Sequence, residues 1–152
     1  MNTNHLDSLL HKPASTDQSF TSDRYHFKAQ LFLDVNPAGD SILHFSASVF
    51  DVFGSYYNLP SDSSTDCFMN IYFDLCEIER RKMELVMNSH SWNAVQLDSI
   101  YQRATENFDK QSELYLKEVQ AGKNKKESDK WNRYVLENLG IDNKKIFGLT
   151  GF

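Results

Sequence analysis

Four carboxylates in the middle of the chain have types and spacing that suit metal-assisted chemistry. Asp74, Glu77 and Glu79 fall within six residues, and Asp51 lies on what we expect to be a neighbouring strand. Clustered carboxylates hold Mg²⁺ in enzymes that hydrolyse phosphodiesters. Such sites usually place Glu-x-Lys on a strand, whereas the residue two positions after Glu77 is a second acid. The cluster is therefore read either as a metal-dependent site or as the charged, solvated start of a helix.

The other chemistry-bearing residues do not form a motif that identifies a family. The sequence contains no P-loop, no Gly-rich dinucleotide fingerprint, no Ser-hydrolase elbow and no His-Glu-x-x-His segment. Cys67 and Cys76 lie nine positions apart, which on one strand places them on opposite faces and prevents a disulfide. His26 and His44 are expected ~20 Å apart along a sheet, too far to share a metal ion. We expect no cofactor, no metal site and two buried thiols in a reducing compartment.

Two segments alternate apolar and polar residues, and this alternation predicts a β-hairpin. Residues 25–35 and 41–49 each follow period two, which is typical of half-buried strands. The Asn-Pro pair between them suits a type I turn, and Gly39 suits the left-handed residue of a G1 bulge. This turn places Asn36 opposite Asp40 and fixes the register. The expected core-facing pairs are Leu33 with Leu43, Leu31 with Phe45, Ala29 with Ala47 and Phe27 with Val49.

The opposite face of this expected sheet carries more aromatic rings than solvent exposure favours. The rings expected there are Phe32, Phe50, Phe68 and Tyr72. The same register places His26 across from Phe50 and His44 across from Phe32. A bulge near residues 49–50 accounts for a slip in the inward parity after Val49. Rings on an outer face require cover by a helix, by the C-terminal tail, by a protein partner or by a second copy of the chain.

The rest of the sequence predicts one further strand and two helices. Residues 68–76 alternate again and indicate a third strand, whereas residues 77–88 fit either a fourth strand or a helix, and their composition favours helix. Residues 92–120, with Ser91 as N-cap, have apolar side chains spaced three and four residues apart, which predicts a helix. Residues 128–139 show the same spacing. The expected fold is α+β, an antiparallel sheet of three or four strands packed on two C-terminal helices.

This α+β domain is expected to occupy residues 23–152 as one unit. Residues 1–22 are expected to form a short helix and a mobile linker in front of it. Residues 54–66 form a polar loop in this interpretation. The apolar C-terminal tail is expected to dock on its own core, with a docking peptide for a partner as the alternative.

Charge is distributed unevenly between the two halves of the 152-residue chain, whose net charge is −5. Residues 1–76 hold nine Asp against three Lys or Arg, whereas residues 77–152 have a net charge of +1. The acidic half repels nucleic-acid phosphates, and its charge suits either a solvated surface without a partner or a basic protein partner. No apolar run approaches 18 residues and the N-terminus lacks the features of a secretory signal, so we expect a cytoplasmic protein without membrane contact.

The sequence leaves three functions open. The first is a non-enzymatic binding protein, an acidic inhibitor, immunity-type protein or adaptor, because no catalytic constellation is evident. The second is a metal-dependent enzyme acting on nucleotides or nucleic acid, and the third is a domain that binds a small apolar ligand between sheet and helix. For the first function, the partner is expected at the acidic hairpin end and the loop around Tyr56 and Tyr57, and a homodimer is expected to use the outer sheet face. The expected partner-binding residues are Phe32, Asp34, Asp40, Phe50, Tyr56, Tyr57 and Tyr72.

Overall fold

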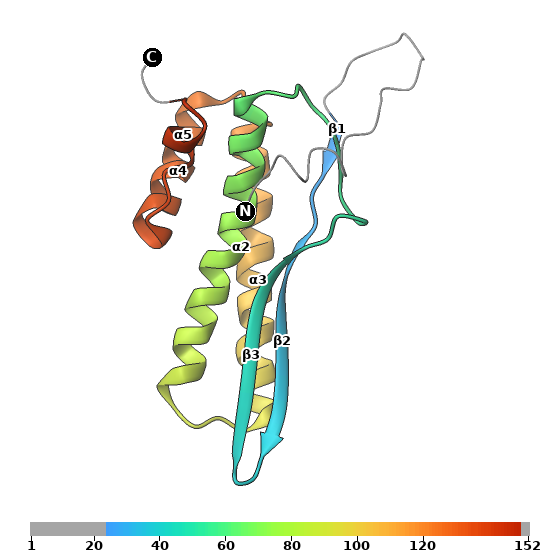
Figure 1. Ribbon diagram of the computed structural model, residues 1–152, viewed down its shortest axis with the longest axis vertical. Coiled ribbons are helices and arrows are strands. Elements are labelled where there is room, and N and C mark those ends of the chain that lie inside the picture. The colour runs from blue at the N-terminus through green and yellow to red at the C-terminus, as the bar shows by residue number, and fades with distance from the viewer. Residues whose placement is uncertain (1–23, 150–152) are drawn as a thin grey trace.

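The computed structural model describes residues 24–149 and shows an α+β chain in which the strands precede the helices (Figure 1). The strands are β1 (Arg24–His26), β2 (Ala29–Ala38), β3 (Ser41–Phe50) and β4 (Tyr56–Asn58). The helices are α2 (Ser63–Ser89), α3 (Ala94–Val119), α4 (Lys125–Leu139) and the four-residue α5 (Asn143–Ile146). The helix and linker expected in residues 1–22 lie outside the described residues.

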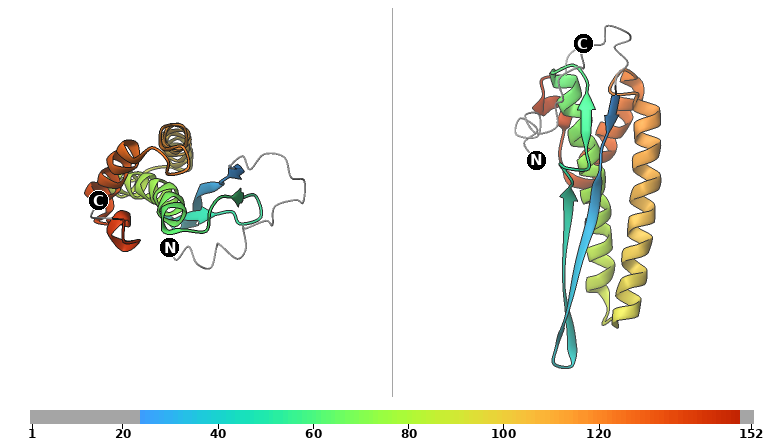
Figure 2. Two further views of the ribbon diagram at one scale, coloured as in Figure 1. Left: turned by 90° about the horizontal axis from the view of Figure 1, so that it is seen from above. Right: turned by 90° about the vertical axis from the view of Figure 1, so that its right-hand side faces the viewer.

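The strands form two separate antiparallel pairs rather than the single sheet that the sequence predicted. β2 and β3 make a long hairpin, and β1 pairs with β4 so that His26 lies opposite Tyr56 and not Phe50. Helix α2 lies between the hairpin on one side and α4 and α5 on the other, with α3 packed alongside (Figure 2). The hairpin therefore rests on helices with one face only, and its tip extends past the loop that joins α2 to α3 (Figure 1).

Residues 68–76 belong to helix α2, so the prediction of a third strand was wrong, whereas residues 77–88 are helical as their composition favoured. α2 contacts the hairpin, α3, α4 and α5, and most of its N-terminal half is buried on every side. A helix buried all round has no polar face, and its apolar residues can fall on alternate positions by chance. Phe68 and Tyr72, which were expected on an outer face, therefore lie in the core.

The hairpin register also differs from the predicted one. Ala29 pairs with Phe50, and the ladder stays in step from there to the turn, without the bulge expected near residues 49–50. The connection is a two-residue turn at Gly39 and Asp40, in which only the glycine has a positive φ, +62°. This is the pattern of a type II′ turn, whose twist matches that of the strands it joins. Asn36 pairs with Leu43 instead of facing Asp40.

The observed register is displaced by three residues from the predicted one, and an odd displacement turns every side chain of β3 to the other face. β2 faces the helices as expected, with Ala29 and Leu31 buried. β3 turns its even-numbered residues inward, including Ser46. His44 pairs with Val35 rather than with Phe32. The odd-numbered apolar residues of β3 consequently point away from the helices.

The two long C-terminal helices begin and end close to the predicted positions. Asn93, rather than Ser91, caps α3 in a capping box: its side chain accepts from the Gln96 amide N–H at 2.9 Å, and its own N–H donates to the Gln96 side chain at 3.0 Å. Asn124 caps α4, and Gly140 ends that helix in the left-handed conformation.

The C-terminal tail packs on the chain's own core in the part that the structure describes. Phe147 and Leu149 contact the core, and α5 contacts α2 and α4. This agrees with the expectation for the tail as far as residue 149, and residues 150–152 lie outside the described range.

Three tyrosines fasten the elements to one another by donating hydrogen bonds to backbone carbonyls. The Tyr72 hydroxyl of α2 donates to the Phe27 carbonyl at 3.0 Å, and the Tyr101 hydroxyl of α3 donates to the Leu31 carbonyl at 3.0 Å. Tyr115 joins α3 to α2 in the same way at 2.8 Å. The hairpin is therefore attached to both long helices by polar contacts as well as by its buried side chains.

Candidate functional site

The outer face of the hairpin, which points away from the helices, carries an exposed apolar strip. Phe32 of β2 is 46% exposed, and Leu43, Phe45 and Val49 of β3 are 61%, 61% and 37% exposed. The solvated face of an antiparallel sheet is normally polar, and contiguous apolar surface commonly marks an interaction site. We call these four side chains, with the adjacent Ala47, the outer hairpin strip.

Negative charge accompanies the strip. Asp34 pairs with Phe45 across the hairpin, so a carboxylate stands in the middle of the apolar side chains. One of its oxygens accepts from the Asn36 side-chain amide at 2.8 Å, and Asp40 is exposed at the turn. Residues 29–50 contain no Lys or Arg. The strip is therefore an apolar surface with acidic groups at its centre and at its tip.

A polar network anchors the inner side of β3 to α2 behind the strip. Glu77 accepts hydrogen bonds from Ser48 at 2.5 Å, from Arg80 at 2.7 and 2.8 Å and from Arg81 at 2.9 Å. Arg80 also donates to Ser46 at 3.1 Å. Burial alone opposes ionisation of Glu77, but the hydrogen bonds from Arg80, Ser48 and Arg81 outweigh it and lower the pKa of the carboxyl to about 2. The strip thus sits on a charged, hydrogen-bonded support.

A groove of about 550 Å³ lies at the hairpin tip, between β3 and the loop that joins α2 to α3. Asp40 and His44 line it from the hairpin, and His90 and Trp92 line it from the loop. The Trp92 ring N–H donates to the Val86 carbonyl at 3.0 Å, and the ring packs 5.3 Å from the His90 ring, centroid to centroid. The tip therefore offers aromatic and imidazole groups on the inner side of the hairpin, behind the outer hairpin strip.

Three of the seven predicted partner-binding residues lie on or beside the strip, namely Phe32, Asp34 and Asp40. The other four do not. Phe50 faces inward with its ring centroid 6.2 Å from that of Phe73, and Tyr57 and Tyr72 are buried in the core. Tyr56 is exposed, but it belongs to β4, outside the hairpin. The structure therefore does not bring the seven residues together as one surface.

Two of the carboxylates considered for metal catalysis are held by local polar partners. Asp51 accepts from the Gly54 amide N–H at 2.8 Å and pairs with Lys28 at 3.0 Å, and both contacts lower its pKa. Asp74 accepts from the Asn143 side-chain amide at 2.7 Å. Burial raises the pKa of Asp74, and the hydrogen bond from Asn143 opposes that rise.

The other two carboxylates point in different directions from α2. Glu79 is buried and pairs with Lys82 at 2.8 Å, which in turn donates to the Tyr134 hydroxyl of α4 at 2.9 Å. Glu77 belongs to the network under β3. Across residues 24–149, no group of three or more His, Cys, Asp or Glu side chains is arranged to hold a metal ion. The four acids therefore act as four separate polar contacts in this fold.

Leu43, Phe45 and Val49 are surface candidates that sequence reasoning placed in the core. The sequence contained a signal for their true position. If the odd-numbered residues of β3 are taken as buried, Phe50 and Val52 interrupt the alternation and a bulge is needed. An uninterrupted even-numbered inward set, from Ile42 to Phe50, needs no bulge and predicts the observed face.

No protein-family model, curated protein or solved structure matches this chain. None of the helices within residues 24–149 is both long enough and apolar enough to cross a membrane. Fold and site together define an α+β protein in which a helix-backed hairpin presents an apolar, acidic surface.

Proposed function

We propose that this chain is a non-enzymatic binding protein, of the inhibitor, immunity or adaptor type, that holds a basic protein partner on the outer hairpin strip. The observation that supports this function is the exposure of Leu43 and Phe45 on a hairpin whose formal charges are all negative. Interfaces commonly combine apolar contacts with polar groups, and opposite charges steer the partners together. A partner surface with apolar side chains and with Lys or Arg placed to meet Asp34 and Asp40 fits this pattern.

The partner must contact more than the strip. Ten residues per strand at ~3.4 Å each, on two strands ~4.8 Å apart, give a face of roughly 350 Å². Each side of a standard protein interface buries about 800 Å². The groove lined by His90 and Trp92 lies on the inner side of the same tip, and we propose that a partner reaching around the tip gains part of the remaining area there.

A homodimer through the same face is a second candidate, because an apolar strip also suits a second copy. Two stacked copies would bring together faces that hold Asp34 and Asp40 and no Lys or Arg, so no ion pair forms within that contact. This charge pattern favours a basic partner.

The separate contacts of the four carboxylates likewise favour binding over metal-dependent catalysis. The buried, free thiols of Cys67 and Cys76 fit a reducing, cytoplasmic location, which is part of the proposal.

Capture of a partner from the native source tests this function when two matched variants are compared. Phe45→Asp places a charge in the strip. Ile146→Asp places the same charge at a similarly exposed apolar site, 65% exposed, on α5 across α2 from the hairpin (Figure 2). We expect Phe45→Asp to weaken capture at least tenfold and Ile146→Asp to leave it unchanged. Binding should also weaken as the salt concentration rises from about 50 to about 500 mM.

Two results would contradict the proposal: equal capture by both variants, or a partner whose affinity is independent of salt. Light scattering on the purified chain measures its oligomeric state and so distinguishes a homodimer from binding of a basic partner. A dimer that dissociates in Phe45→Asp and persists in Ile146→Asp would replace the basic partner with a second copy.

A further inference from the structure

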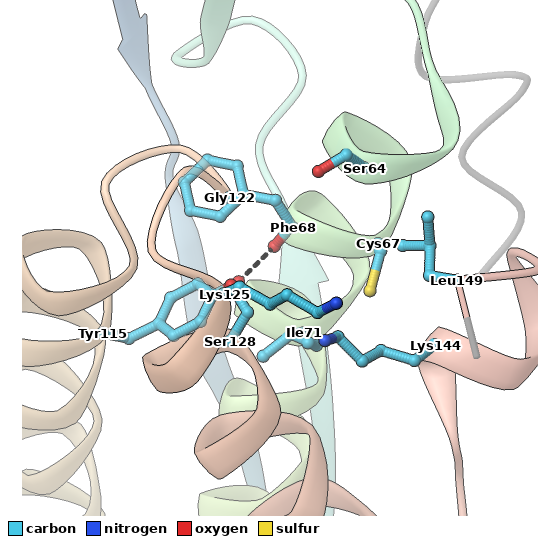
Figure 3. A pocket seen from close by; sticks show the side chains of 10 residues that line it. All are labelled: Ser64, Cys67, Phe68, Ile71, Tyr115, Gly122, Lys125, Ser128, Lys144 and Leu149. Atoms are coloured by element: carbon cyan, nitrogen blue, oxygen red, sulfur yellow. Dashed lines mark hydrogen bonds between the residues drawn. The ribbon is translucent and has the colours of Figure 1, made fainter. Parts of the chain in front are cut away.

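A cavity of about 230 Å³ lies at the end of the molecule opposite the hairpin tip. It is enclosed by the first turns of α2, the loop after α3, the start of α4 and the segment after α5 (Figure 3). Its apolar wall consists of Cys67, Phe68, Ile71, Tyr115 and Leu149. None of these residues belongs to the outer hairpin strip, so the cavity is independent of the proposed partner site.

Two lysines line this apolar cavity from different helices. In Figure 3 the side chains of Lys125, on α4, and Lys144, on α5, extend toward one another from opposite sides. The Lys144 side chain is only 12% exposed, and its ammonium pairs with Asp129, which is half exposed. A nearly buried ammonium is rarely found without strong compensation. The cavity therefore combines apolar walls with two ammonium groups, one of which is paired with Asp129.

A buried hydroxyl adds a second polar group to the same cavity. Ser128, one turn along α4 from Lys125, lines the cavity and is more than nine-tenths buried. Its Oγ has no hydrogen-bond partner in the part of the chain that the structure describes. Buried hydroxyls are normally hydrogen-bonded, because leaving one unsatisfied is unfavourable. An acceptor atom placed between the hydroxyl and the ammonium groups would satisfy it.

The shape of the α3–α4 loop keeps this cavity compact. Gly122 has a φ of +87°, and a Cβ built on it would lie 2.9 Å from the Ser64 Oγ on α2. Glycine adopts this conformation without strain, so the loop approaches the first turn of α2 closely at the rim of the cavity.

We propose that this cavity binds a small organic carboxylate, an aliphatic or aromatic acid. Its carboxylate lies between Lys125, Lys144 and the Ser128 hydroxyl, and its apolar body lies against Phe68 and Ile71. The volume corresponds to roughly eight water-sized atoms, which suits a molecule of the size of benzoate or hexanoate. The apolar wall distinguishes such an acid from inorganic phosphate, which has no apolar part.

Calorimetric titration of the full chain with sodium benzoate and with sodium hexanoate tests the proposal. Benzyl alcohol and hexanol serve as neutral matches, and inorganic phosphate serves as the anion without an apolar body. We expect one or both acids to bind with a Kd of about 0.01 to 1 mM, the range open to ligands this small. The alcohols and phosphate should each bind at least tenfold more weakly.

Variants place the binding in this cavity. Lys125→Met and Ser128→Ala should each weaken binding of the better acid about fivefold or more. Lys126→Met, an exposed change in the same turn of α4 that does not line the cavity, is the control and should have no effect. Thermal unfolding confirms that each variant is folded. Because Lys125 is exposed, its replacement leaves the core intact and remains informative even if Ser128→Ala is less stable.

Three results would overturn the proposal. The first is no saturable heat from either acid at about 10 mM, well above the expected Kd. The second is equal affinity for an acid and its alcohol, which would remove the role of the ammonium groups. The third is an equal loss of affinity in Lys125→Met and Lys126→Met, which would indicate general attraction to the basic start of α4 rather than a site.

Discussion

Glu77 makes the stability of this protein sensitive to acid. Its pKa is about 2 in the folded chain because hydrogen bonds from Arg80, Ser48 and Arg81 outweigh the effect of burial, whereas an unfolded Glu titrates near ~4.3. A carboxyl whose pKa is depressed by folding contributes stability that is fully present above its unfolded pKa and is lost as the pH falls toward its folded pKa. The affected window therefore runs from about pH 5 down to about pH 2.

We expect the free energy of unfolding to fall by roughly 2 kcal/mol across that window on account of Glu77, after allowance for its partial exposure. Urea titrations at several pH values measure it. Glu77→Gln should flatten this part of the profile and should lower stability at pH 7. Glu106→Gln, at an exposed position on α3, is the matched control. A profile of the same steepness in Glu77→Gln and in the parent chain would contradict the assignment.

The two cysteine thiols are protected from chemical modification by burial rather than by a disulfide bond. Burial raises the pKa of both Cys67 and Cys76 to about 12, and thiols react as thiolates. At pH 8 the native chain should therefore resist iodoacetamide for hours, and it should take up two labels promptly in urea. Mass spectrometry of timed aliquots measures this uptake. Stoichiometric labelling of the folded chain within minutes would show that one of the thiols is accessible.

At the scale of the elements, the turn decides which face of β3 becomes surface. The alternation of residues 25–35 and 41–49 correctly predicted two strands joined as a hairpin. It could not fix their register, because a five-residue connection around Asn36 and a two-residue connection at Gly39 satisfy the same local propensities. The odd displacement between these two registers is what exchanges buried and exposed residues along β3.

Gly39 carries the conformation on which that turn depends. Its φ is +62°, and a Cβ added there would meet no atom within 4 Å. Gly39→Ala should therefore destabilise the protein through backbone strain alone, by about 1 to 2 kcal/mol. Asp40→Ala, in the same turn, should change the free energy of unfolding by less than about 0.5 kcal/mol. Equal effects of the two substitutions in urea unfolding would mean that the turn does not require a left-handed residue.

Helix α2 shows a second limit of local patterns. Its N-terminus carries a cap that was not predicted, since Asp62 accepts from the Thr65 amide N–H at 2.9 Å. Its N-terminal half was wrongly predicted as a strand, because four packing partners bury it on all sides and leave no polar stripe. α3 and α4 were predicted to within a few residues because each keeps one solvated face. A central helix is the element that single-sequence periodicity misses.

In the whole molecule, local sequence patterns correctly place only some of the large apolar side chains in the core or on the surface. The α+β class, the hairpin and the C-terminal helices follow from local patterns. Phe32 and Asp34 were placed on the outer face by the parity of β2, and Asp40 was expected at the turn. The rest of the candidate site depends on tertiary packing. Glu77 and Arg80 of α2 draw Ser46 and Ser48 inward, so the apolar residues of β3 face out.

Phe45 distinguishes the two registers in the folded molecule, and Leu31, which is buried in both, is the reference. The predicted register buries both, whereas the observed structure leaves Leu31 3% exposed and Phe45 61% exposed. Leu31→Asp would bury an unpaired charge and should cost at least about 3 kcal/mol, enough to unfold a marginally stable domain. Phe45→Asp should leave the free energy of unfolding within about 0.5 kcal/mol of the parent value. Urea unfolding followed by circular dichroism measures both. A severe loss of stability in Phe45→Asp would mean that this ring is a core residue, and no partner could then reach the outer hairpin strip.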